Sequence, residues 1–349
     1  MRGRLTRLLV VLAALAAAAC APPEPLRQEA YVFGTRVEIQ VVGVPAAQAN
    51  AAMAAALREF DRLHREYHAW QPSQLSALNE ALAAGKKLEV SAELAGFIRR
   101  AQEVSAAGEH LFDPGIGRLI ALWGFQSDEI VAKLPADKDV KALLRRKPSI
   151  AGLRLQGNLA SSPRRAVALD FGGYLKGVAL DRAATILREQ GVGNALINIG
   201  GNIMALGDKH GKPWRVGIRH PRPEKVGNVP LASLELRDGE AIGTSGDYQR
   251  FFEVDGRRYC HLIDPRSGRP AEGTQSLTIL IPPGPEAGMR SDAYSKPLFI
   301  AGERWLELAK KLEIDAVLKV SAGGTAEVTQ KMKARLTIEA PDLIMRIRN

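Results

Sequence analysis

Alternating apolar and polar residues predict strands at several places along the chain. Val37, Ile39 and Val41 are apolar and the residues between them are polar, which is the period of a half-buried strand. Short apolar runs at 167–170, 195–199, 277–281 and 316–320 predict further strands. Residues 252–259 predict a hairpin that turns at Asp255-Gly256, because an Asp-Gly pair readily adopts the positive φ angles of a tight turn.

Segments with helical periodicity lie between these predicted strands. Leu57, Phe60 and Leu63 share one face of an Ala-rich segment, and Ser91 is a predicted N-cap for a helix that stops near Gly108. Residues 177–190 predict a helix closed by Gly191, and 292–312 predict another. Strands and helices mix without a regular βαβ rhythm, and no repeat or long linker divides the chain. The pattern therefore favours an α+β fold in a single composite domain.

Composition narrows the class of protein. The chain has 349 residues, of which 46% are hydrophobic and 25% are charged, values that are ordinary for a globular protein. They exclude a disordered chain, a collagen-like chain and a disulfide scaffold. No apolar run reaches the roughly 18 residues of a membrane-spanning helix.

The first 19 residues change the meaning of the net charge of +10. Arg2, Arg4 and Arg7 precede the apolar run Leu8–Ala19, which predicts an export signal over residues 1–19. Those arginines account for three of the ten net charges, so the remaining chain carries +7. No Lys/Arg stripe interleaved with aromatic residues occurs, and we expect no nucleic-acid partner.

Cys20 follows this segment directly. Ala17-Ala18-Ala19-Cys20 resembles a bacterial lipobox, with Ala17 where such boxes usually carry Leu. We predict a lipidated Cys20, an extended tether over 20–29 and a globular domain over 30–349, on a membrane-anchored lipoprotein. The alternative is ordinary cleavage nearby, with Cys20 incidental. The other cysteine, Cys260, is expected to be a buried packing residue.

A Gly pair precedes the helix predicted at 177–190. Gly172-Gly173 and Lys176 lie between a strand and a helix start, where exposed N–H groups and a mobile cation suit a phosphate. The segment is neither a Walker A loop nor a G-x-G-x-x-G fingerprint. The alternative is a plain strand–helix turn with a solvated lysine.

Two polar loops flank the predicted hairpin, which should bring them close together. They are 244–248, Thr-Ser-Gly-Asp-Tyr, and 259–270, which contains His261, Asp264 and Arg266. A histidine can exchange a proton near neutral pH, and an arginine can hold a phosphate bidentately. A third loop at Asp113 could accept a hydrogen bond from a ligand, or be only a turn into a helix.

Taken in order, these motifs resemble the ApbE family, the FAD:protein FMN transferases, from about Phe33 to Gly302. The strongest stretches are 170–181, 198–201, 244–248 and 261–268. The resemblance implies an exported α+β flavin enzyme that binds FAD and uses Mg²⁺. It would join FMN through its phosphate to a Thr or Ser hydroxyl of a target protein and release AMP. The alternatives are an FAD pyrophosphatase, giving FMN and AMP, and a non-catalytic FAD-binding lipoprotein.

The same resemblance implies particular site residues. His261 and Asp264 would be catalytic. The flavin nucleotide would be contacted by Gly34, Asp113, Lys176, Asp181, Thr244, Ser245, Gly246, Asp247, His261 and Arg266. The expected partner is an FMN-accepting domain of a membrane redox complex or of another exported protein, facing the periplasm.

The implied metal site departs from the family pattern, which places an Asp and a Thr one helical turn apart, with a backbone carbonyl as a further ligand. Asp292 matches the Asp and Gly173 the carbonyl, but Lys296 replaces the Thr, and an ammonium cannot ligate Mg²⁺. Ser295 is one substitute ligand. Asp292, carbonyls, phosphates and water are another set, since Mg²⁺ commonly keeps few protein ligands. The third possibility is that Lys296 takes the electrostatic place of the metal.

Overall fold

The computed structural model describes residues 24–127, 129–225, 227–341 and 343–349. The predicted export signal at 1–19 and Cys20 lie outside these residues. Strand β1 (Leu26–Val32) already occupies part of the predicted tether, so a tether that ends at residue 29 is too long. Among the residues described, no helix combines the length and the apolar character that a membrane crossing requires.

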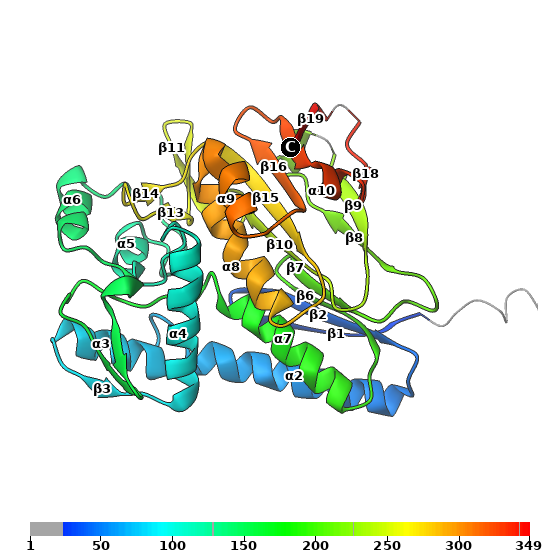
Figure 1. The fold of residues 1–349 in the computed structure, drawn as a ribbon, viewed down its shortest axis with the longest axis horizontal. Helices are drawn as coiled ribbons and strands as arrows, with labels where there is room; N and C mark the ends of the chain where they lie inside the picture. The colour runs from blue at the N-terminus through cyan, green and yellow to red at the C-terminus, as the bar shows by residue number, and fades with distance from the viewer. Residues whose placement is uncertain (1–23, 128, 226, 342) are drawn as a thin grey trace, which may run out of the picture.

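A nine-stranded sheet forms the middle layer of the fold (Figure 1). Neighbouring strands run antiparallel, except for the last pair, which is parallel. The strand order is β1, β2 (Thr35–Val42), β6 (Asn194–Ile199), β7 (Asn202–Leu206), β10 (Ala241–Gly246), β15 (Thr274–Ile281), β16 (Val317–Ser321), β17 (Ala326–Thr329) and β19 (Met345–Arg348).

Helices cover one face of this sheet and a smaller sheet covers the other. The helices are α2 (Ala46–Glu66), α7 (Leu175–Glu189), α8 (Ala287–Ile300) and α9 (Trp305–Lys311). The smaller sheet contains β8 (Trp214–Ile218), β9 (Ala232–Leu236) and β18 (Leu336–Ile338). In β7, Met204 faces the helical core and Ile203 faces the core beneath the smaller sheet. Both faces of the central strands are therefore buried, which produces continuous apolar runs in the sequence.

A lobe inserted between α2 and α7 packs beside these layers, on the left of Figure 1. Its elements are α3 (Gln74–Ala83), β3 (Leu88–Glu89), α4 (Ala92–Ala107), α5 (Gly117–Leu122), α6 (Asp137–Arg145), β4 (Arg154–Gln156) and β5 (Leu159–Ser161). The hairpin β11 (Phe251–Val254)–β12 (Arg257–Cys260) and the pair β13 (Ile263–Asp264)–β14 (Arg269–Pro270) join it to the sheet. The indole of Trp123 donates to the Gly268 carbonyl at 2.7 Å. This bond ties the lobe to the loop that carries His261.

Most of the predicted elements are present, and the α+β class is confirmed. The hairpin turns at Asp255-Gly256 with positive φ at both residues, and the Ser91 side chain caps α4. The strand predicted at 167–170 is wrong, because only Ala168 pairs, in an isolated bridge to Ile116.

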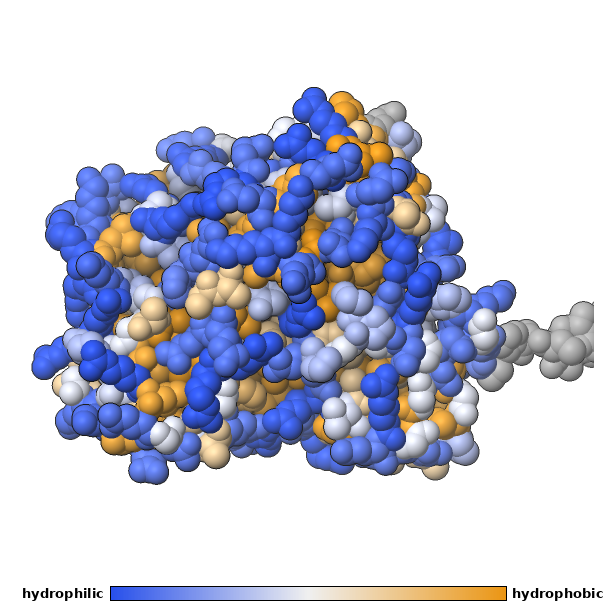
Figure 2. All heavy atoms as spheres, viewed as in Figure 1, coloured by the Kyte–Doolittle hydropathy of each residue, from blue (hydrophilic) through white to orange (hydrophobic). Residues whose placement is uncertain are grey.

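The single helix predicted at 292–312 is also wrong. Helix α8 begins five residues earlier, at Ala287, and contains Pro297 within it. It ends before Gly302, whose φ of 61° belongs to the left-handed region, and α9 follows. Figure 2 shows mainly polar side chains on the face that carries α8 and α9, with apolar residues visible between them.

Three glycines let α8 approach its neighbours at backbone distance. A Cβ on Gly177 of α7 would lie 2.5 Å from the Gly288 carbonyl oxygen, and one on Gly288 would lie 2.7 Å from that of Gly177. A Cβ on Gly243 of β10 would lie 2.0 Å from the Ser291 carbonyl oxygen. Any side chain at these positions would push α8 away from α7 or from the sheet.

We expect Gly243→Ala to destabilise the fold by about 1–3 kcal/mol, because the added methyl overpacks the contact between β10 and α8. The measurement is the free energy of unfolding in denaturant. Gly96→Ala in α4 is the matched control, since nothing lies within 4 Å of its added Cβ. It should be neutral or stabilising by up to about 1 kcal/mol. Equal effects of the two substitutions would contradict the close approach.

Candidate active site

Two turns and a strand end meet at one end of the large sheet and form the wall of a cavity. The turns are Phe33-Gly34 between β1 and β2, and Gly200-Gly201 between β6 and β7; the strand end is that of β10. The cavity has a volume of about 640 Å³. This volume is typical of cofactor and small-molecule sites. Phe33 adopts φ of 57°, an uncommon conformation for a bulky residue, and is held against the rings of Phe60 and His64.

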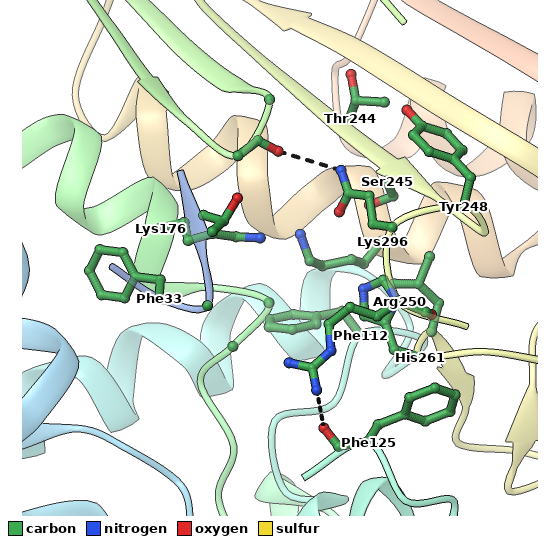
Figure 3. Close-up of a pocket in the computed structure, with 18 of the residues that line it drawn as sticks. Phe33, Phe112, Phe125, Lys176, Thr244, Ser245, Tyr248, Arg250, His261 and Lys296 are labelled. Carbon is green, nitrogen blue, oxygen red and sulfur yellow. Dashed lines mark hydrogen bonds between the residues drawn. The ribbon is translucent and has the colours of Figure 1, made fainter. Parts of the chain in front are cut away.

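The structure brings most of the predicted ligand-binding residues to this cavity. Lys176, in the first turn of α7, and Lys296, near the end of α8, point toward one another across it (Figure 3). Gly173 lies beneath Lys296, and a Cβ there would be 2.8 Å from the Lys296 Cε. The predicted residues that line the cavity are Gly34, Asp113, Gly173, Lys176, Thr244, Ser245, His261 and Lys296.

His261 is enclosed by protein but keeps part of its ring open to the cavity. Its Nδ1 lies 3.2 Å from the Arg250 carbonyl oxygen. Burial, followed by the positive charges of Lys176, Arg250 and Lys296, lowers the pKa of His261 to about 3. The ring is therefore neutral near pH 7. Because a carbonyl only accepts, Nδ1 carries the hydrogen and Nε2 keeps a lone pair that can take a proton.

Arg250 is a site residue that the sequence analysis missed. Its guanidinium donates to the Phe125 carbonyl at 3.0 Å and to the Ser127 carbonyl at 2.6 Å, beneath Phe112 and beside His261 (Figure 3). It immediately precedes β11, and its position next to the predicted hairpin is the one signal that could have drawn attention to it.

Asp292 lies behind the cavity wall, with no exposed surface. Its Oδ2 accepts from the Gly177 N–H at 2.9 Å, and its Oδ1 accepts from the Asn202 amide at 2.9 Å and from the Lys296 ammonium at 2.5 Å. Lys296 also donates to the Asp292 carbonyl at 2.7 Å. Burial lowers the pKa of Lys296, and Asp292 opposes that shift.

Several predicted site residues are paired with protein groups instead of lining the cavity. Asp247 makes a two-bond ion pair with Arg222, at 2.7 and 2.6 Å. Asp264 and Arg266 bind each other through two parallel contacts of 2.9 and 2.8 Å. These pairs satisfy the carboxylates within the loops and so stabilise the loops beside the cavity.

Asp181, Gly246 and Ser295 also lie outside the cavity lining. Asp181 accepts from the N–H groups of Gly288 and Met289 at 2.8 Å each, which caps the start of α8, and burial raises its pKa to about 6. Ser295 is fully buried and its hydroxyl contacts Ser245 and the Asp292 carbonyl, at 2.8 Å each. Sequence patterns do not distinguish such capping and packing roles from ligand contacts.

Asp113 lines the cavity and also holds its own loop in place through hydrogen bonds. Its Oδ1 accepts from the Gly115 and Ile150 N–H groups at 2.8 Å each, and burial raises its pKa. Cys260 is buried, as predicted, and its thiol pKa is raised to about 12 by that burial. It is therefore a packing residue beside His261.

The family model described as the ApbE family matches residues 33–318. The chain belongs to the ApbE family. An FAD:protein FMN transferase of Rhodobacter capsulatus is 39% identical over 90% of this chain, which spans only 59% of that longer protein. The FAD:protein FMN transferase of Vibrio cholerae is 30% identical, over 89% of this chain and 93% of its own length. The crystal structure of the ApbE protein of Thermotoga maritima matches with a TM-score of 0.80 and 28% identity, over 89% of this chain and 99% of that one.

We expect His261 to make stability depend on pH. Its folded pKa of about 3 lies below the ordinary 6.5, so between these values the unfolded chain binds a proton that the folded chain does not. The melting temperature of the wild-type protein should therefore fall relative to that of His261→Gln as the pH is lowered from 7 to 4. Thermal melts of both proteins across that range measure the difference. A difference that does not change with pH would contradict a buried neutral imidazole.

Proposed function

We propose that this ApbE-family chain transfers FMN from FAD to a Thr or Ser hydroxyl of a target protein, through a phosphoester bond, with release of AMP. The observation that carries the proposal is the neutral His261, with a free Nε2, in a cavity of about 640 Å³ that two lysines also line. This combination provides a base and positive charge beside a space that suits a dinucleotide.

The reaction balances with the groups present. The acceptor hydroxyl oxygen attacks the phosphorus of the FMN moiety, and its proton passes to His261 Nε2. The bond from that phosphorus to the bridging oxygen breaks, and its electron pair leaves with the AMP phosphate. The positive charges of Lys176, Lys296 and Arg250 stabilise the charge that develops on the phosphoryl oxygens.

A second cavity of about 480 Å³ supports an entry route for the acceptor. It shares Phe33, Gly34, Lys176 and Arg250 with the first cavity, and it extends past Tyr31 and Gln71. One cavity can therefore hold the flavin nucleotide while a segment of the target protein occupies the other. The shared lysine and arginine lie where the two substrates would meet.

The Mg²⁺ that the family resemblance implies does not fit the residues present. Both Asp292 oxygens already accept hydrogen bonds, the Ser295 hydroxyl lies outside the cavity lining, and Lys296 holds the position of the expected Thr ligand. Among the described parts of the chain, no cluster of three or more His, Cys, Asp or Glu residues could hold a metal ion.

The location of the enzyme is part of the proposal. The charged and apolar segment at 1–19 and the lipobox-like Ala17–Cys20 support export and a lipid anchor at Cys20. The acceptor would then be the FMN-accepting domain of a membrane redox complex or of another exported protein. Strand β1 begins six residues after Cys20, so the enzyme would sit close to the membrane surface.

We expect His261→Ala to lower FMN transfer at least about 100-fold, because the hydroxyl loses its base, while FAD binding is retained. The assay follows a fluorescent flavin band on a candidate acceptor, and flavin fluorescence titration measures binding. Cys260→Ser is the matched control at the neighbouring buried position and should keep transfer. Loss of FAD binding in His261→Ala would instead make this residue a ligand contact.

The same assay separates the alternatives. AMP released in the absence of acceptor supports an FAD pyrophosphatase. FAD that stays bound and intact with every cation and acceptor would contradict both enzymatic functions.

We expect Cys20→Ser to move the protein from the membrane fraction to the soluble exported fraction, because the serine hydroxyl is not lipidated. Cell fractionation with an immunoblot, and labelling with a radioactive fatty acid, measure the change. FMN transfer by the purified variant should be unchanged. Membrane association that persists in the variant would contradict the lipid anchor.

A further inference from the structure

Lys296 occupies the place that the family pattern gives to a metal ion and its Thr ligand. Its ammonium contacts the Asp292 carboxylate at 2.5 Å and the Asp292 carbonyl at 2.7 Å, and its aliphatic chain lies over Gly173. Asp292 and Gly173 are the two positions implied as metal ligands. The lysine side chain therefore spans the space between both of them.

The Asp292 carboxylate has little capacity left for a divalent ion. Oδ1 accepts from Asn202 and Lys296, which fills its two lone pairs, and Oδ2 accepts from the Gly177 N–H. A cation placed beside these groups would meet an ammonium that is 9% exposed and held in position by two hydrogen bonds. Replacing the ammonium would mean leaving a lysine charge unpaired in a buried site, which is costly.

The ammonium is also oriented for a ligand. Two of its three donors go to Asp292, and Lys296 lines the cavity, where it faces Lys176 (Figure 3). The remaining N–H can donate to an oxygen in that space. Lysine has no acceptor, so this contact requires an acceptor atom, and the positive charge of the ammonium favours an anionic group such as a phosphate.

We propose that Lys296 is a built-in counter-cation for the diphosphate of FAD, and that this enzyme transfers FMN without a divalent metal ion. The ammonium donates a hydrogen bond to a diphosphate oxygen, while its two hydrogen bonds to Asp292 keep it in place. The inference rests on the proposed flavin transfer and adds the source of charge neutralisation at that site.

The first test uses the wild-type protein alone. The full-length chain is purified in detergent, stripped with EDTA, checked for residual metal by mass spectrometry, and assayed for FMN transfer with EDTA or with Mg²⁺. We expect the two rates to agree within about twofold, because the lysine supplies the charge. A rate that collapses in EDTA and returns with Mg²⁺ would overturn the proposal.

The second test restores the family pattern with Lys296→Thr. Thr and Asp292 then lie one helical turn apart, and the variant should lose transfer at least about 100-fold in EDTA and regain it with Mg²⁺. Lys176→Met is the matched control, because it removes the facing charge without creating a ligand. It should be slowed equally in EDTA and in Mg²⁺. Rescue of both variants by Mg²⁺, or of neither, would argue against the proposal that Lys296 replaces a metal ion at this position.

The third test does not depend on activity. Mn²⁺ is titrated into each protein with FAD bound, and bound Mn²⁺ is measured by electron paramagnetic resonance. Lys296→Thr should bind Mn²⁺ and the wild type should not; equal binding would overturn the proposal. If neither the wild type nor the variants transfer FMN under any condition, the proposed function fails. The comparison of Mn²⁺ binding still decides the role of Lys296. If Lys296→Thr does not fold, the wild-type measurements decide it.

Discussion

The architecture of the site depends on one buried carboxylate. Asp292 accepts hydrogen bonds from the start of α7, from Asn202 at the start of β7 and from Lys296 on its own helix. A charge with no exposed surface is tolerable only when such donors surround it, since desolvating a lone carboxylate costs several kcal/mol. The glycines at the crossings of α8 with α7 and β10 allow the donors to come that close. The same close packing fixes the wall of the cavity and the position of the lysine that faces it.

The charges around the cavity serve binding and proton transfer together. Lys176, Lys296 and Arg250 make the site positive, which suits a diphosphate. Burial, together with these charges, lowers the pKa of His261 and keeps its imidazole neutral. A neutral imidazole can accept a proton from a hydroxyl, whereas an imidazolium cannot. The Arg250 carbonyl then fixes which nitrogen is free. Arg250 thus has two roles. Its backbone carbonyl fixes the tautomer of His261, and its guanidinium adds to the positive charge around the cavity.

Local sequence patterns predicted the elements that depend on only a few consecutive residues. The Asp255-Gly256 turn, the Ser91 cap and the helix closed by Gly191 all follow from backbone preferences of a few residues. The start of α8 could not be predicted this way, because it is capped by Asp181 from a helix more than a hundred residues earlier. The partners of Asp181 and Asp247 could not be predicted from local patterns either, because they come from other elements of the fold. The assignment of these residues to the ligand rests on the family resemblance and stays a prediction. Lys176, Thr244, Ser245 and His261 reach the cavity because they sit at element ends, where chain turns converge on one end of the sheet.

Lysine at position 296 also supplies the counter-charge that the buried Asp292 carboxylate requires in the absence of substrate. With a metal ligand at that position, the Asp292 carboxylate would depend on a bound ion for its counter-charge, and metal affinity would become part of the folding free energy. With Lys296 the charge is balanced within one turn of α8, at the i and i+4 positions that face each other on a helix. The wall of the cavity is therefore complete before any ligand arrives, and its positive charge is carried by a side chain whose stem is packed on Gly173. A pre-organised cation needs no reorganisation when the diphosphate changes charge during transfer, which is the condition under which electrostatic stabilisation is most effective.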